Sequence, residues 1–193
     1  MNKGTKTVCV QGLGFVGFAM AVAIAAVKKG GKPLYNVIGI DLPNDSGKER
    51  INQINSGKMP FKTSDKNFCN TFARVFKQGN FLASFATDLF SMADVIIVDI
   101  NFDLDFSGID PKVDFYPIKK AIKTIGMNMQ PDALVIVETT VPPGTTSEII
   151  YPYLINLLKN RFPELSDVNL AHSYERVMPG KEYFNSITDF WRV

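Results

Sequence analysis

A glycine-rich turn between an apolar strand and an apolar helix constrains the fold of this chain more than any other feature. Residues 7–11 (TVCVQ) are short and β-branched, as expected of a buried strand, and Gly12-x-Gly14-x-x-Gly17 follows them directly. Residues 15–29 are rich in Ala, Val and Met, which predicts a helix that ends in a basic pair and two glycines. Glycines at this spacing permit a tight turn, a close backbone approach to a pyrophosphate and close helix–strand packing. The sequence therefore predicts a strand–turn–helix unit of the kind that holds a dinucleotide.

Apolar segments of two lengths alternate along the rest of the chain. Further buried strands are predicted, in chain order, at residues 36–41, 81–85, 93–100, 133–138 and 168–171. Helices are predicted at residues 48–55, from the cap Asp65 to Gly79, at 115–129 and at 145–159, with a polar loop at 101–112. Strands that are apolar throughout and alternate with helices are typical of a parallel sheet. We therefore predict an α/β fold, a Rossmann-type doubly wound parallel sheet with helices on both faces.

The composition limits the classes of protein to consider. The chain has 193 residues, 46% of them hydrophobic and 21% charged, so it is long enough for one domain with a full core and is not a disordered chain. Its net charge of +2 comes from scattered basic residues, which argues against nucleic acid or a membrane surface as a partner. Two cysteines and the single His172 are too few for a disulfide framework or a Cys/His metal site. We expect a reduced, cytoplasmic globular domain without a metal.

The segment 8–27 offers an alternative, because it has no charged residue and could be a signal peptide or a membrane span. Its front half is crowded with glycines, each of which costs a helix interior about 1 kcal/mol relative to alanine. The crowding favours the glycine-rich turn over a targeting segment.

Asp41 ends the second predicted strand, 24 residues after Gly17. A carboxylate at this place can accept hydrogen bonds from both hydroxyls of an adenosine ribose, and it would repel a 2′-phosphate. The pattern thus favours NAD over NADP, although the nearby Lys48 and Arg50 leave NADP open. The alternative is that the glycines only pack a helix on a sheet and that Asp41 caps a turn.

Two polar segments follow predicted strands nearer the carboxyl end of the chain. Ligands of open α/β sheets bind outside the carboxyl ends of the strands, so Thr140 in the segment ETTVPPGTT would lie beside the nicotinamide end of a dinucleotide. On the local pattern alone, Thr139 or Thr140 is equally well a turn residue and Thr145 a helix cap. Glu175 and the arginine after it can be an ordinary surface ion pair, or Glu175 can face a reaction centre. The residues alone leave these alternatives open.

The order and wording of six segments resemble one known family. The segments are KTVCVQGLGFVGFAMAVA, VIGID, INSGKMP, ADVIIV, ETTVPPGTT and HSYERVMPG. Together they resemble the amino-terminal domain of the UDP-glucose/GDP-mannose dehydrogenase family, and the resemblance covers most of the chain. The form YERVMPG is most similar to the branch that acts on nucleotide-linked N-acetylhexosamines.

The resemblance implies an NAD-dependent oxidoreductase. The family oxidises the C6 alcohol of a UDP- or GDP-linked sugar to the uronic acid in two NAD-dependent steps, with a cysteine thioester that water hydrolyses. Carried over by position, the catalytic residues are Thr140, which helps to hold a water, and Glu175, which acts with that water in hydrolysis. The cofactor-binding residues are Gly12, Gly14, Phe15, Val16, Gly17, Asp41, Asn101 and Glu138.

The chain also departs from the pattern of the family. Tyr174 stands where the family usually has proline, and Phe102-Asp103 stands where it commonly has Thr-Pro. The nucleophilic cysteine, the catalytic lysine and most sugar-nucleotide contacts of the family lie beyond the matched region. Cys9 and Cys69 are instead interpreted as buried small apolar groups.

We therefore expect residues 1–193 to be one NAD(P)-binding Rossmann-like domain, with the central helix and substrate domain of the family absent from this chain. The expected partner is a nucleotide-sugar substrate, and a homo-oligomer is expected for the full-length protein. The fragment alone is expected to be inactive. Two other functions fit the same turn: a dinucleotide-sensing module without catalysis, and a different β-hydroxyacid-type dehydrogenase.

Overall fold

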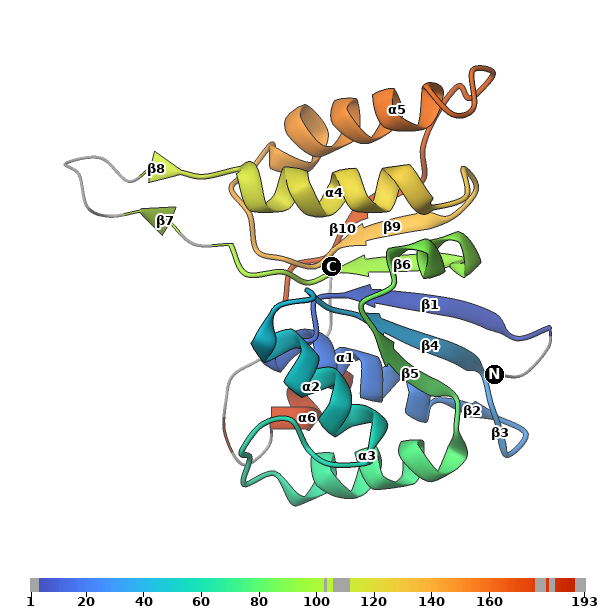
Figure 1. Ribbon diagram of the computed structural model, residues 1–193, viewed down its shortest axis with the longest axis vertical. Coiled ribbons are helices and arrows are strands. Elements are labelled where there is room, and N and C mark those ends of the chain that lie inside the picture. Colours follow the sequence, from blue (N-terminus) through green and yellow to red (C-terminus); the bar gives the residue numbers. More distant parts are fainter. Residues whose placement is uncertain (1–3, 103, 106–111, 176–179, 181–182, 190–193) are drawn as a thin grey trace.

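The computed structural model describes residues 4–102, 104–105, 112–175, 180 and 183–189, and it is built around one parallel sheet. Figure 1 shows helices on both faces of this sheet. Its six strands are β1 (Lys6–Gln11), β4 (Tyr35–Ile40), β5 (Phe81–Ser84), β6 (Val95–Val98), β9 (Leu134–Val137) and β10 (Leu170–His172). They lie in the order β10-β9-β6-β1-β4-β5, and every neighbouring pair is parallel. The predicted α/β class and the Rossmann-type doubly wound sheet are confirmed.

The strand order reverses beside β1. From β1 the chain continues to β4 and β5 on one side, and then crosses to β6, β9 and β10 on the other side. The connections that leave β1 and β6 therefore diverge, and ligands of open α/β sheets bind at the carboxyl ends of strands at such a reversal.

Two hydrophobic clusters cover the two faces of the sheet. The first joins strand residues such as Val8 and Val10 to the helices α1 (Phe15–Ala26), α2 (Asp45–Asn55), α3 (Lys66–Gln78) and α6 (Tyr183–Thr188). The second joins Cys9 and its neighbours to the 3-10 helix η1 (Thr87–Met92) and the helices α4 (Tyr116–Asn128) and α5 (Tyr151–Lys159). Successive residues of β1 thus point into different clusters, as the two-residue period of a strand requires.

Polar side chains begin two of the helices, and the cap predicted at Asp65 is confirmed. The carboxylate of Asp65 accepts a hydrogen bond from the backbone N–H of Phe68 at 3.0 Å and begins α3. The side chain of Asn44 accepts one from the N–H of Gly47 at 2.8 Å and begins α2. These bonds satisfy donors that the helix itself leaves unpaired.

The predicted end of the first helix is wrong. α1 ends at Ala26, and Lys28–Lys29 forms the short strand β2, which pairs antiparallel with β3 (Lys32–Pro33). Gly30 and Gly31, with φ of +58° and +77°, form the two-residue turn between them. Two successive glycines with positive φ suit a tight hairpin as well as a helix end, and the hairpin is the outcome here.

The carboxyl-terminal part of the chain differs from the prediction in several details. The helix expected at 145–159 begins with a π-helical segment, η2 (Thr145–Ile150), before α5. The residue that caps η2 is Gly144, with φ +84°, and Thr145 is buried rather than a cap. The last strand is shifted to Leu170–His172, and α6 lies outside the predicted helices. Within the expected loop, β7 (Leu104–Asp105) pairs antiparallel with β8 (Lys112–Val113).

Within the part of the chain that the structure describes, no helix is long and apolar enough to cross a membrane.

Candidate functional site

The sheet brings the predicted site residues to one edge. Gly12 follows β1, Asp41 follows β4, and Asn101 lies shortly after β6. Glu138 follows β9, and Glu175 lies shortly after β10. Because all these strands are parallel, their carboxyl ends lie at the same edge of the sheet, where the strand order reverses beside β1.

The first and third glycines of the turn are required by the fold itself. A Cβ on Gly12, whose φ is +95°, would lie 1.8 Å from the backbone oxygen of Asp99. A Cβ on Gly17 would lie 2.0 Å from the backbone oxygen of Gly12. Both contacts are far inside van der Waals range, so the strand, the turn and α1 could not approach one another this closely with any other residue.

The middle glycine has no such reason within the described chain. Gly14 is the residue before α1, with φ −61° and ψ −170°, a backbone conformation open to other residues. Nothing lies within 4 Å of the place where its Cβ would be. The backbone N–H groups of the next residues, among them Phe15 and Val16, open the helix without an intrahelical acceptor. An anion that binds at the start of α1 would need a residue without a side chain at Gly14, because a side chain would occupy the space of the anion.

Asp41 is held by an ion pair at the carboxyl end of β4. Its Oδ2 accepts a hydrogen bond from Nε of Arg50 at 2.8 Å, and its Oδ1 accepts one from the backbone N–H of Leu42 at 2.8 Å. The side chains of Asp41 and Arg50 are 6% and 22% exposed. A ribose that reaches this carboxylate therefore also meets the guanidinium of Arg50.

The structure separates the two threonines after β9. Thr139 is buried, and its Oγ1 accepts a hydrogen bond from the N–H of Ile100 at 2.9 Å and donates one to the oxygen of Ile100 at 3.1 Å. Thr139 thereby joins the ends of β9 and β6. Thr140 is exposed at the sheet edge, while Glu138 is buried and its backbone N–H donates to the oxygen of Val98. Thr139 is thus the structural residue, and Thr140 is the one that a ligand can touch.

Glu175 is half-buried, and Asn101 is exposed. Arg176, the partner of Glu175 in the surface ion-pair alternative, and Asp103 lie outside the described residues.

Two side chains near the turn, the carboxylate of Asp99 and the phenol of Tyr183, are not among the site residues predicted from the sequence. Asp99 follows β6, and its Oδ2 would lie 2.9 Å from a Cβ on Gly17. Its signal is a charged residue that interrupts the apolar run ADVIIVDI. Tyr183, in α6, donates a hydrogen bond from its hydroxyl to the backbone oxygen of Phe15. A helix as short as α6 has too few turns to show a periodic pattern.

Cys9 does not have the features of a nucleophile. Cys9 is fully buried in β1, and burial raises the pKa of its thiol to about 12. Cys69 is only half-buried on α3, so the expectation that both thiols are buried is wrong for Cys69.

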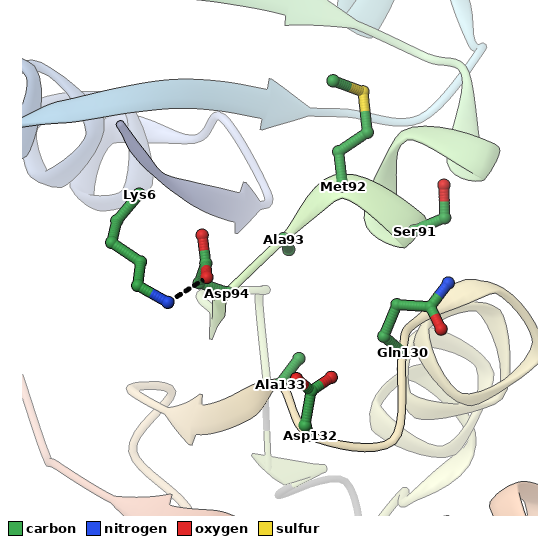
Figure 2. Close-up of a pocket in the computed structure, with 8 residues that line it drawn as sticks. All are labelled: Lys6, Ser91, Met92, Ala93, Asp94, Gln130, Asp132 and Ala133. Atoms are coloured by element: carbon green, nitrogen blue, oxygen red, sulfur yellow. Dashed lines mark hydrogen bonds and ion pairs between the residues drawn. The ribbon is translucent and has the colours of Figure 1, made fainter. Parts of the chain in front are cut away.

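Two cavities lie at opposite edges of the sheet. One, of about 360 Å³, is lined by residues of the segment that follows Thr140 and by His172 at the end of β10. The other, of about 260 Å³, lies at the amino ends of the strands, where Lys6 pairs with Asp94 (Figure 2). Only the first adjoins the predicted site residues.

Comparison with known proteins is consistent with this geometry. A curated relative, the UDP-N-acetyl-D-mannosamine dehydrogenase of Pyrococcus horikoshii, is 31% identical over 176 residues, which are 90% of this chain and 37% of the relative. The enzyme of the same name from Methanocaldococcus jannaschii is 28% identical over 91% of this chain and 35% of its own length. The solved structure of the NDP-N-acetyl-D-galactosaminuronic acid dehydrogenase of Methanosarcina mazei matches 98% of this chain with a TM-score of 0.80 and 25% identity. This chain covers 38% of that structure.

The chain thus spans little more than a third of the length of these relatives. The sequence pattern of the UDP-glucose/GDP-mannose dehydrogenase family, NAD binding domain, matches residues 6–189. This match covers the strand, the glycine-rich turn and every predicted site residue, and the chain therefore belongs to the UDP-glucose/GDP-mannose dehydrogenase family, as its NAD-binding domain.

Proposed function

We propose that this chain is the cofactor half of a dehydrogenase that oxidises the C6 alcohol of a UDP- or GDP-linked sugar to the uronic acid. The observation that carries the cofactor site is the bare backbone at Gly14, for which the described chain offers no internal reason. The relatives are named for nucleotide-linked N-acetylhexosamines, which favours a sugar of this class.

NAD, when bound, accepts a hydride from the alcohol carbon. In this proposal, the N–H groups of Phe15 and Val16 bind the pyrophosphate at the positive end of α1. Asp41 accepts hydrogen bonds from the adenosine ribose, with Arg50 beside it. Asn101 and Glu138, which come after β6 and β9, are proposed to bind the cofactor on that side of β1.

Thr140 and Glu175 are proposed to serve the hydrolytic step. The exposed hydroxyl of Thr140 holds a water at the sheet edge, and the carboxylate of Glu175 polarises this water towards the acyl carbon. The thiol that carries the acyl group comes from outside this chain in the proposal, because Cys9 is sealed inside β1.

Calorimetric titration of the chain with NAD tests the cofactor site. We expect saturable binding that Gly14→Ala abolishes without lowering the thermal midpoint, because the added methyl group meets the ligand and no protein atom. Asp94→Asn, at the opposite edge of the sheet, is the control and should bind NAD as the wild type does. Full NAD affinity in folded Gly14→Ala would contradict the proposed site.

Glu175→Gln in the full-length protein separates the proposal from its alternatives. If Glu175 serves acyl hydrolysis, the variant should retain hydride transfer from the alcohol and lose release of the acid. A β-hydroxyacid-type dehydrogenase or a dinucleotide sensor does not need this carboxylate. In either of them, Glu175→Gln should change neither turnover nor NAD binding.

A further inference from the structure

Tyr183 joins α6 to the first turn of α1. Its hydroxyl donates a hydrogen bond to the backbone oxygen of Phe15, the first residue of α1. The two rings lie against each other, with centroids 4.2 Å apart, and Tyr183 is 1% exposed. The bond therefore reaches the glycine-rich turn from a segment 168 residues further along the chain.

α6 is fixed by a polar contact as well as by packing. The backbone N–H of Phe184 donates to Oδ2 of Asp65 at 2.8 Å, while Oδ1 of the same carboxylate caps α3. Asp65 is 2% exposed. One buried carboxylate thus holds the starts of α3 and α6 together, so the hydroxyl of Tyr183 has a defined position.

Two carboxylates lie close to this hydroxyl. Burial raises the pKa of Tyr183, and the negative charges of Asp99 and Glu175 raise it further. The phenol therefore remains a hydrogen-bond donor at neutral and moderately alkaline pH. Asp99 also lies against Gly17, the last glycine of the turn.

The bond from Tyr183 acts on a peptide group that the cofactor is proposed to use. The carbonyl of Phe15 and the N–H of Val16 belong to the same peptide unit. A phosphate oxygen that accepts from this N–H makes the carbonyl a better acceptor, and the tyrosine bond in turn makes the N–H a better donor. A ligand at the turn and the bond to α6 thus strengthen each other, and thermodynamic linkage makes the effect reciprocal.

We propose that Tyr183 is a positioning residue that couples binding of a dinucleotide at the glycine-rich turn to the placement of α6. The proposal rests on the proposed NAD site and adds a residue that responds to its occupancy.

Hydrogen exchange of this chain with and without NAD, read by mass spectrometry of peptides, tests the coupling. In the wild type we expect NAD to slow amide exchange in Tyr183–Thr188. In Tyr183→Phe, which keeps the ring and loses the hydroxyl, this slowing should disappear. The Kd for NAD should rise only about 1.5-fold, because the bond is lost with and without NAD and only the mutual strengthening, about 10–30% of one hydrogen bond, affects binding. Purely structural damage would raise exchange equally with and without NAD.

Tyr151→Phe is the matched control. Tyr151 is the first residue of α5, which covers the other face of the sheet, and its hydroxyl donates a hydrogen bond to Oδ1 of Asp167 at 2.9 Å. This variant should keep both the wild-type Kd and the slowing in α6.

The outcomes separate the two proposals. If NAD fails to bind the folded wild type, the proposed function fails and this inference fails with it. If NAD binds and exchange in α6 does not change, or if Tyr183→Phe keeps the slowing, the coupling is overturned while the NAD site stands. The wild-type comparison alone decides the matter if the variant does not fold.

Discussion

At the scale of single residues, the pair Asp41–Arg50 is proposed to determine which dinucleotide fits the end of β4. A carboxylate offers about four acceptor positions, and the hydrogen bonds from Arg50 and from the backbone of Leu42 use two of those of Asp41. The others can serve the two ribose hydroxyls of NAD. The guanidinium of Arg50 could also bind the 2′-phosphate of NADP, but its positive charge is already balanced by the carboxylate of Asp41.

Asp41→Asn should therefore shift the preference from NAD towards NADP. The variant loses the charge that attracts Arg50 and repels phosphate, so we expect the affinity for NAD to fall about tenfold and the affinity for NADP to rise. Calorimetric titration of wild type and variant with both cofactors measures the two changes. Asp94→Asn, which loses the more exposed ion pair with Lys6 at the opposite edge of the sheet, should change neither affinity. A variant that binds both cofactors as the wild type does would show that the ribose is held elsewhere.

At the scale of single elements, the end of α2 protects the edge strand of the sheet. β5 has a neighbour on one side only, so half of its backbone groups point away from β4. The side chain of Asn55 pairs with both groups of Ala83, donating to its oxygen at 2.8 Å and accepting from its N–H at 3.0 Å. An amide side chain thus takes the place of one residue of a further strand.

Asn55→Ala should weaken this edge of the fold. Loss of two partly exposed hydrogen bonds should lower the free energy of unfolding by about 1–2 kcal/mol. The loss is not larger because water can bind the freed backbone groups of Ala83. For a chain of this size the thermal midpoint should fall about 2–4 °C per kcal/mol. Asn52→Ala, an exposed position on the same helix, is the control and should leave the midpoint within about 1 °C. Equal midpoints for the two variants would refute a stabilising role for Asn55.

The elements also show what the sequence could and could not predict. The strands and the capped helices follow from local signals, since apolar runs and cap residues such as Asp65 act within a few positions. The sequence also predicts that residues such as Gly12 and Asp41 lie at the same edge of the sheet. Each follows a strand, and in the predicted fold class the strands are parallel, so their carboxyl ends lie together. The β2–β3 hairpin could not be told from a helix end, because Gly30 and Gly31 suit both. The contact of Tyr183 with Phe15 depends on tertiary packing across 168 residues and has no local signal.

At the scale of the whole molecule, one sheet carries two hydrophobic clusters. In β1, Val8 and Val10 belong to the cluster under α1 and α3, while Cys9 between them belongs to the cluster under α4 and α5. In β4, Val37 and Ile38 divide in the same way. Loss of the helices from one face would expose strand side chains on that face and loosen the strands that the other face needs.

The two faces should therefore unfold together. We expect urea to remove amide protection from α3, on one face, and from α5, on the other, at the same concentration in pulsed hydrogen exchange. Leu154→Ala, at a fully buried position of α5, should cost about 2–5 kcal/mol and lower both midpoints equally, although α3 lies on the opposite face. If α5 lost its protection at a lower urea concentration than α3, the two clusters would be separate folding units. Destabilisation of one face by Leu154→Ala would then lower the stability of the other face less than the alternating side chains of the shared sheet imply.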